Sequence, residues 1–298
     1  MNFQKLGVSE PPSALVRTLH CIMISCVIGF AVPGYAASPN IHEAENWQHL
    51  FNGKNLDDWA IKVTGYPLNH NYANTFQVRN NKLVVDYSEY TSFENQFGHI
   101  FYKHPFSHYA LNISYRFVGD QAINGPEWAY KNSGVMLHAQ SPDSLTLKQP
   151  FPISIEAQFL GGRDNNTSRP TANVCTPGTH IRYQEKLFTT HCLSSQSETF
   201  VDGWVDVVIV VLGGGSITHY VNGQEVLKYA QPILDDEAQK VLDKPTTLNS
   251  GYIALQAESH PIEFRTVRIL NLAGCTDQAA NNFQPYFVKS DPGQCEYD

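Results

Sequence analysis

Short segments in which apolar and polar residues alternate recur from residue 47 to residue 270, and this pattern limits the possible folds more than any other feature of the chain. In residues 110–117 the apolar side chains fall on one face of an extended strand, namely Leu111, Ile113, Tyr115 and Phe117. Helical periodicity is confined to residues 235–242, which open with acidic residues. Many strands with almost no helix predict an all-β fold of two packed antiparallel sheets, as in a jelly-roll sandwich.

The expected strands give one core domain with a short appendage. A hairpin is expected where two alternating segments meet at Asn80-Asn81, and another at Asn222-Gly223. The remaining expected strands are residues 110–117, 134–139, 153–159, 205–212, 251–257 and 264–270. We expect a sandwich from 47 to 272, a polar lead-in from 37 to 46 and a separate small element from 273 to 298.

The first residues have the pattern of a secretory signal peptide. Lys5 and Arg17 precede an apolar run at 19–32, and small residues follow up to Ala36. We expect residues 1–36 to be a signal peptide. The mature protein is then expected to be secreted or periplasmic and to have no membrane span after cleavage. An uncleaved anchor is the alternative.

Four cysteines remain after the expected cleavage, and an even number in an exported chain predicts disulfides. Pairing between neighbours closes the shortest loops and so loses least entropy. This favours Cys175 with Cys192 and Cys275 with Cys295. A zinc site is the alternative, although no C-x-x-C pair is present.

The charge distribution excludes some classes of partner. The formal net charge is −8, and no cluster of Lys and Arg stands out. Nucleic acids and anionic membrane surfaces require such a cluster, so we expect neither as a partner. Charged residues make up only 16% of the chain, which suits sheet faces that hydrogen-bond neutral groups.

Several motifs together resemble the 3-keto-disaccharide hydrolase family. The stretch Leu-Phe-Asn-Gly-Lys-Asn-Leu-Asp-Asp-Trp at 50–59 is similar to the family's entry motif. Further similar motifs are Asn-Ser-Gly-Val at 132–135, Ile-Glu-Ala-Gln at 155–158, Val-Asn-Gly at 221–223, Gly-Tyr-Ile-Ala-Leu-Gln at 251–256 and Phe-Arg-Thr-Val-Arg-Ile at 264–269. The chain departs from the family pattern at Thr266, where the family has Asn. It departs again at Glu258-Ser259-His260, where a His-Gly pair is usual.

The resemblance implies a concanavalin-like jelly roll and an enzyme that cleaves disaccharides or glucosides oxidised at C3 of glucose. A 3-keto group acidifies the proton on C2, so cleavage can proceed by proton abstraction, elimination and hydration. This route needs a base, a donor to the enolate oxygen and an acid for the leaving group. It implies a carbohydrate partner and no cofactor, and a divalent metal has no supporting motif.

The strand period of two suggests which residues form the site. It places Glu156 and Gln158 on the face opposite Ile155, and by the same count His138 and Gln256 point away from the core. We expect these four residues to share one cleft on a polar, concave sheet face. Glu156 is the candidate base or acid and His138 its counterpart or the enolate donor. The candidate substrate-binding residues are Gln158, Gln256, Arg265 and Asn132.

Each assignment has a structural alternative. Glu156 could be a solvated carboxylate, His138 a hydrogen-bonded strand residue and Arg265 a buried cation that pins the sheet. Asn132 begins Asn-Ser-Gly at 132–134, which suggests a tight turn into a strand. His180 and His191 flank the bridged loop and are either metal ligands or solvent-exposed lid residues.

Two other functions compete with the enzyme. A carbohydrate-binding module on the same scaffold would need aromatic and amide groups but no ionisable pair. A structural cell-envelope protein attached through the Cys275 to Cys295 element would need no filled cleft. The deciding feature is whether Glu156 and a second ionisable group converge on one sugar-sized position.

Overall fold

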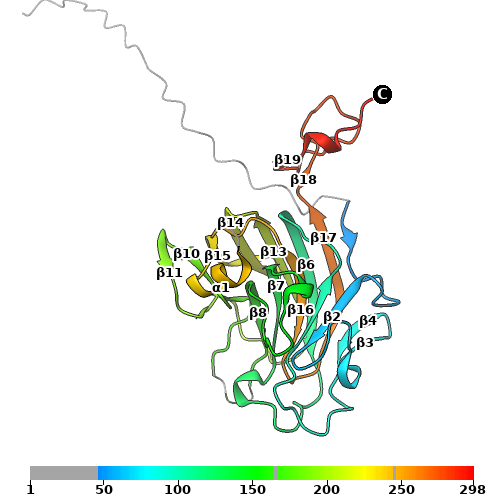
Figure 1. Cartoon of the computed structure of the whole chain (residues 1–298), viewed down its shortest axis with the longest axis vertical. Coiled ribbons are helices and arrows are strands. Elements are labelled where there is room, and N and C mark those ends of the chain that lie inside the picture. The colour runs from blue at the N-terminus through cyan, green and yellow to red at the C-terminus, as the bar shows by residue number, and fades with distance from the viewer. Residues whose placement is uncertain (1–45, 164, 166, 244–245) are drawn as a thin grey trace, which may run out of the picture. The chain divides into compact units, whose positions relative to one another are not determined.

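The computed structural model describes residues 46–298 except 164, 166, 244 and 245. The predicted signal peptide, and all of the predicted lead-in except residue 46, lie outside the described residues. Within them, most strands belong to two antiparallel sheets that pack face to face (Figure 1). The fold class predicted from the alternating segments is therefore confirmed.

One sheet has ten strands, nine of them in a continuous hydrogen-bonded order, with β1 (Gln48–His49) paired to β17. The order is β11 (Lys186–Phe188), β10 (Thr179–Tyr183), β15 (Gln224–Leu234), β14 (Ser216–Val221), β13 (Val205–Leu212), β6 (His108–Phe117), β17 (Ile262–Asn271), β4 (Lys82–Val85) and β3 (Phe76–Arg79).

The other sheet has seven strands. Their order is β12 (Cys192–Leu193), β9 (Asn173–Cys175), β8 (Ile155–Leu160), β7 (Asn132–Ala139), β16 (Tyr252–Ala257), β5 (Gly98–Tyr102) and β2 (Trp59–Val63). The sequence analysis did not predict β2, β5 or the short strands β9 to β12.

The apolar faces of the two sheets meet in one core, as the alternation predicts. On β8 the side chains of Ile155, Ala157 and Phe159 are fully buried. Phe159 stacks on Tyr115 of β6 with 4.4 Å between ring centroids, so an aromatic pair joins the two sheets. Burial of each such large side chain stabilises the fold by roughly 2 kcal/mol. The face of the seven-stranded sheet that points away from this core is called the outer face below.

The predicted helix is α1 (Asp236–Leu242). The Asp235 side chain caps it by accepting hydrogen bonds from the backbone N–H groups of Glu237 and Ala238, at 3.1 and 2.8 Å. Four 3₁₀ turns complete the helical structure of the described residues: η1 (Tyr72–Asn74), η2 (Glu127–Ala129), η3 (Pro142–Ser144) and η4 (Pro292–Gln294).

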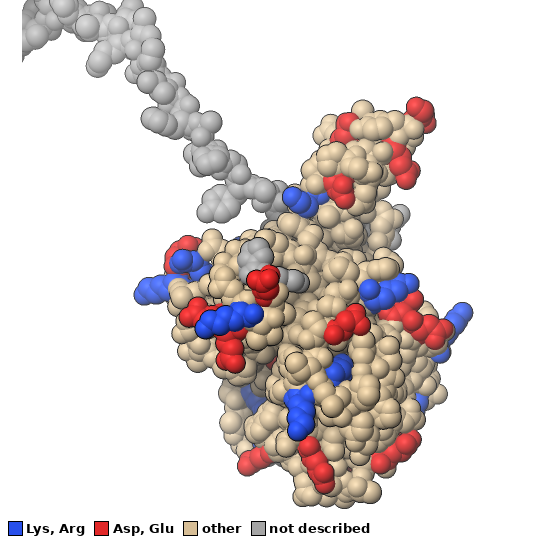
Figure 2. Space-filling view, in the orientation of Figure 1, with Lys and Arg blue, Asp and Glu red and all other residues tan. Residues whose placement is uncertain are grey.

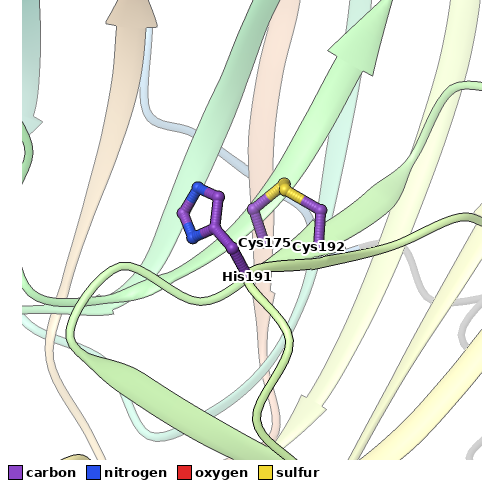
Figure 3. Close-up of side chains that lie close together, drawn as sticks. All are labelled: Cys175, His191 and Cys192. Atoms are coloured by element: carbon purple, nitrogen blue, oxygen red, sulfur yellow. A yellow bond between two sulfur atoms is a disulfide. The ribbon is translucent and has the colours of Figure 1, made fainter.

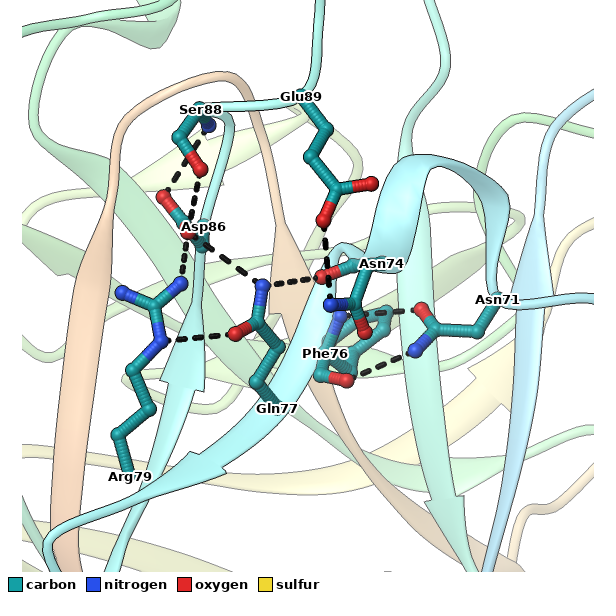
Figure 4. Close-up of polar contacts among 8 residues, drawn as sticks. All are labelled: Asn71, Asn74, Phe76, Gln77, Arg79, Asp86, Ser88 and Glu89. Carbon is teal, nitrogen blue, oxygen red and sulfur yellow. Dashed lines mark hydrogen bonds and ion pairs between the residues drawn. The ribbon is translucent and has the colours of Figure 1, made fainter.

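The predicted hairpin at Asn80-Asn81 joins β3 to β4. Both asparagines have positive φ, 51° and 57°, as a two-residue hairpin turn requires. A polar network fastens this hairpin, in which Arg79 contacts both Gln77 and Asp86 (Figure 4). The Asn71 side chain also donates to the carbonyl oxygen of Phe76 and accepts from its backbone N–H.

The two cysteine pairs favoured by loop length are disulfides in the structure. Cys175–Cys192 joins the edge strand β12 to its neighbour β9. Cys275–Cys295 closes the C-terminal element, in which β18 (Ala273–Gly274) pairs with β19 (Lys289–Ser290). Its main apolar contribution is Tyr286, which packs with Leu270 and Leu272.

Candidate active site

Side chains from neighbouring strands form a polar row across the outer face of the seven-stranded sheet. His99 of β5 lies opposite Lys62 of β2 on one side and opposite Gln256 of β16 on the other. Continuing the β16–β7 register by one residue places Gln256 opposite Gly134. Gly134 in turn lies opposite Gln158 of β8. Residues far apart in the sequence are therefore brought together by strand pairing alone.

Several buried polar atoms in and beside this row have no hydrogen-bond partner among the residues that the structure describes. They belong to five residues that we call the polar cluster: His99, Asn132, Glu156, Gln256 and Glu258. All five side chains are buried, and Gln256 leaves both its amide oxygen and its amide nitrogen unpartnered. A buried polar group without a partner costs about 1 to 3 kcal/mol. Such a concentration of cost on one sheet face is typical of a site that binds a polar ligand.

Glycine at position 134 makes room for the carboxylate of Glu156. A Cβ atom at this position would lie 2.6 Å from Glu156 Oε1 and 3.0 Å from Glu156 Cγ. The Glu156 side chain therefore extends over Gly134 towards the middle of the row. The turn that the sequence suggested at 132–134 is wrong, because these residues lie inside β7. The glycine serves close approach of a side chain rather than a special backbone angle.

Burial controls the charge of the cluster. It raises the pKa of the Glu156 carboxyl well above its usual value of 4.5. Burial also raises the pKa of Glu258, and the charge of Glu156 raises it further, while Arg169 opposes the shift. Burial, with the charge of Lys62, lowers the pKa of His99 to about 3, so the imidazole is neutral at physiological pH. The cluster thus holds a neutral histidine and two carboxyl groups that resist ionising together.

The β7–β8 loop lies across one end of the polar row. Lys62 Nζ donates to the carbonyl oxygens of Val63, Tyr66 and Leu147, at 3.1, 2.9 and 3.2 Å. Leu147 belongs to the β7–β8 loop, as does Phe151, whose ring lies 6.0 Å from that of His99. The buried ammonium group therefore ties this loop to β2. The outer face was expected to be polar and concave, and at this end the loop covers it.

Along β8 the exposure increases from Glu156 to Gln158, while Asn173 of β9 is buried. Glu156 is 6% exposed, whereas its neighbour Gln158 is half-buried. Gln158 Oε1 accepts a hydrogen bond from Asn173 Nδ2 at 3.1 Å. Gln158 is the more exposed of these two amides, and it can contact a hydroxyl-bearing ligand on the outer face.

His138 does not join the polar cluster, so the prediction that it shares a cleft with Glu156 is wrong. The β7–β16 register shifts next to it, and His138 itself has a φ of 50°. Its Nε2 atom contacts the carbonyl oxygen of Gly213, 3.0 Å away in the β13–β14 turn of the other sheet. The irregularity breaks the period of two on which the prediction depended.

Arg265 also lies elsewhere. Its Nε atom donates to Ser114 Oγ at 2.7 Å, and its guanidinium covers the ring of Trp204 at 4.6 Å. Both partners belong to the ten-stranded sheet or lie next to it. A role in the Glu156 site is therefore wrong for Arg265. Its contacts are those of the sheet-pinning alternative, but its side chain is 44% exposed and not buried as that alternative expected.

The bridged edge strand borders the site. Cys175 lies opposite Glu156 in the β8–β9 register. His191 lies close to Cys175 and Cys192, so three metal-ligand side chains meet here (Figure 3). Both sulfur atoms are bonded to each other and not available as thiolates, so the disulfide excludes the zinc reading for this pair. His180 lies on β10, apart from this group.

Sequence reasoning missed His99, Lys62 and Glu258 as members or neighbours of the site. His99 and Lys62 lie on the two unpredicted strands β5 and β2. A signal was available for Glu258, since it is two residues beyond Gln256 and departs from the family pattern. Of the six predicted site residues, the outer face brings together Glu156, Gln158, Gln256 and Asn132.

Blue and red side chains are interspersed on the face shown in Figure 2. In the part of the chain that the structure describes, no helix combines the length and apolar character needed to cross a membrane.

The fold and the site define a β-sandwich protein with a buried acidic cluster on one sheet face. A family model described as 3-keto-alpha-glucoside-1,2-lyase-like domain matches residues 46–270. The chain therefore belongs to this family and is a carbohydrate-active protein. The suspected family resemblance is confirmed.

Comparison with curated protein sequences gave no match. Among solved structures, the chain is similar to a "putative glycosyl hydrolase" from Parabacteroides distasonis ATCC 8503, with 16% identity, 75% of this chain and 92% of the other covered, and a TM-score of 0.46. It is also similar to a β-glucanase of Bacillus licheniformis, with 12% identity, coverage of 76% and 97%, and a TM-score of 0.44. A third is carbohydrate-binding module CBM66 from Bacillus subtilis, with 9% identity, coverage of 70% and 93%, and a TM-score of 0.40.

Proposed function

We propose that this chain is an exported enzyme that cleaves 3-keto-glucosides or 3-keto-disaccharides by removing the C2 proton, eliminating the C1 substituent and hydrating the product. The observation that carries the proposal is the convergence of Glu156, Gln256 and His99 on the outer face, each with an unpartnered buried polar atom. Family membership supports the substrate class. The signal-like first residues support export.

Glu156 has the properties of the base that removes the C2 proton. Its raised pKa brings the carboxylate closer in basicity to the acidified carbon. The side chain lies over Gly134, where no Cβ stands between it and a ligand on the sheet. Met136, which lies opposite it on β7, is apolar and does not compete for the proton.

Gln256 and His99 have the properties of donors to the enolate oxygen at C3. They lie opposite each other on adjacent strands, and Gln256 Nε2 and His99 Nε2 lack partners. A neutral imidazole with its proton on Nε2 donates a hydrogen bond without becoming acidic enough to lose that proton. Donors fixed on a sheet need little rearrangement when charge develops, which is the basis of oxyanion stabilisation.

Asn132 and Gln158 flank this arrangement and offer amides to sugar hydroxyl groups. Asn132 Oδ1 is unpartnered and Gln158 is half-buried. Neutral amides recognise hydroxyl groups without adding charge to a buried site. The described part of the site therefore supplies a base, enolate donors and hydroxyl binders, and it needs no nicotinamide if the sugar arrives already oxidised.

The direct test incubates the purified mature chain with 3-keto-trehalose and with a nitrophenyl 3-keto-glucoside, beside the same sugars without the keto group. We expect release from the keto substrates alone. Glu156→Gln should lower release from both keto substrates by at least about 100-fold, the usual range for loss of a positioned base. A matched control is Glu127→Gln, whose carboxylate is 90% exposed.

Saturable binding of a sugar without release from any substrate would instead make the chain a carbohydrate-binding module. Cleavage of the unoxidised sugars at an equal rate would remove the role of the C2 proton.

A further inference from the structure

Glu258 is a buried carboxyl group for which the proposed mechanism has no role so far. It directly follows the last residue of β16 and lies two residues beyond Gln256. Its side chain is 3% exposed, and Oε2 has no hydrogen-bond partner. No ion pair neutralises it among the described residues, so its burial stabilises nothing evident in the fold.

The backbone next to Glu258 is held in an uncommon conformation. Ser259 has a φ of 83°, which L side chains rarely adopt because of its steric cost. Three hydrogen bonds fix it: Ser259 N donates to Tyr87 Oη at 2.7 Å, Ser259 Oγ accepts from Gln121 Nε2 at 2.9 Å, and Ser259 O accepts from Ala122 N at 2.8 Å. The surrounding chain thus holds the residue after Glu258 against a conformational cost.

Glu258 and Glu156 belong to one electrostatic unit. Glu156 extends from β8 over Gly134, towards the strand pair that β7 forms with β16. The charge of Glu156 raises the pKa of Glu258 beyond the effect of burial. Ionisation of one carboxyl group therefore opposes ionisation of the other. When the pair loses its first proton, it holds one carboxylate and one carboxylic acid. The strand register gives the same grouping, because Glu258 lies two residues beyond Gln256, and Gln256 lies opposite Gly134, over which the Glu156 carboxylate extends. A base and an acid on one sheet face are the pair that elimination requires.

We propose that Glu258 is the proton donor to the leaving oxygen, an assignment that rests on the proposed function of Glu156 as the base. Glu156 takes the C2 proton, and the C2–H electrons form the C2–C3 enolate. The enolate electrons return to form the C1–C2 double bond while the C1–O bond breaks, and the departing oxygen takes the proton of Glu258. Water then adds at C1, giving its proton to the Glu258 carboxylate, and Glu156 returns its proton to C2. The net change is hydrolysis of one glycosidic bond, with both carboxyl groups restored.

A comparison of leaving groups separates this role from a structural one. A sugar alkoxide needs a proton to depart, whereas a nitrophenolate departs without one. In Glu258→Gln we expect release from 3-keto-trehalose to fall by at least about 100-fold, while release from the nitrophenyl 3-keto-glucoside falls by less than about tenfold. Glu156→Gln should lower both substrates alike, because both need the C2 proton removed. Glu127→Gln serves as the exposed control.

Each outcome decides the assignment. An equal loss on both substrates, or no loss on either, in a folded Glu258→Gln protein would overturn the role of Glu258 while leaving the proposed function standing. Absence of release by the wild-type chain would overturn both proposals. If Glu258→Gln does not fold, Glu258→Asp retains the acid at a shorter reach, and the same selective loss on 3-keto-trehalose is expected.

Discussion

The contact between Gly134 and Glu156 gives a quantitative test of the site geometry. In Gly134→Ala the new Cβ would lie 2.6 Å from Glu156 Oε1 and 3.0 Å from the carbonyl oxygen of Ala157. The first distance is well inside normal contact, and both groups are buried. Overpacking of this kind costs about 1 to 3 kcal/mol. Replacement of glycine also reduces the conformational entropy of the unfolded chain, which stabilises the folded state by about 0.4 to 1 kcal/mol. We therefore expect a net destabilisation of about 1 to 2 kcal/mol.

The cause can be isolated with a double-mutant cycle. Glu156→Ala removes the Oε1 and Cγ atoms from the contact and leaves only the carbonyl of Ala157. In that background Gly134→Ala should cost less than about 1 kcal/mol, which gives a coupling energy of about 1 kcal/mol between the two positions. The free energies of unfolding come from urea denaturation at pH 5. The control is Gly98→Ala, whose Cβ would lie 3.2 Å from Phe76 in the core, on the other face of the sheet.

Additive effects of Gly134→Ala and Glu156→Ala would refute this reasoning, because the carboxylate would then lie elsewhere than over the glycine. Coupling between Gly98→Ala and Glu156→Ala of the same size would also refute it, since no contact joins those positions.

Two further predictions concern pH and the C-terminal element. The raised pKa of Glu156 means that the folded chain keeps a proton that the unfolded chain loses above 4.5, so stability falls as the pH rises through the interval between the two values. Relative to the wild type, Glu156→Gln should therefore gain little free energy of unfolding at pH 4 and at least about 1 kcal/mol at pH 9. Urea denaturation at the two pH values measures this difference. An equal difference at both pH values would contradict the raised pKa. Removal of the second disulfide by Cys275→Ser with Cys295→Ser should expose the C-terminal element to limited proteolysis while the sandwich melts within a few degrees of the wild type, because that element packs few apolar side chains. A fall of the main melting transition by more than about 10 °C would show that the bridge supports the sandwich.

The sequence predicted the architecture because alternation records which side of a strand faces the core. It placed Ile155, Ala157 and Phe159 inside and Glu156 outside, as the structure has them. The same count failed at His138, where a register shift and a positive φ turn the side chain towards the other sheet. Local alternation carries no information about such an irregularity, which depends on pairing with a distant strand.

The rest of the site escaped prediction for a different reason. His99 and Lys62 lie on β5 and β2, whose sequences, Gly-His-Ile-Phe-Tyr and Trp-Ala-Ile-Lys-Val, lack a clear alternation. These strands are buried on both faces, one against the core and the other beneath the β7–β8 loop. A strand buried on both faces is apolar almost throughout and so shows no alternation. Only the order of strands in the sheet shows that His99 lies opposite Gln256.

The bridged excursion beside Glu156 has a consequence for the order of folding. Between β9 and β12 the chain crosses to the ten-stranded sheet, forms β10 and β11 and returns, and the disulfide that ties the two ends spans only 17 residues. The long central strand β6 instead binds β13 and β17, with hydrogen-bonded partners 95 and 156 residues apart. Since nearby segments meet sooner than distant ones, the Cys175 edge is expected to form early and to dock as a finished unit. The strand that flanks the candidate base would then be among the first parts of this protein to acquire its shape.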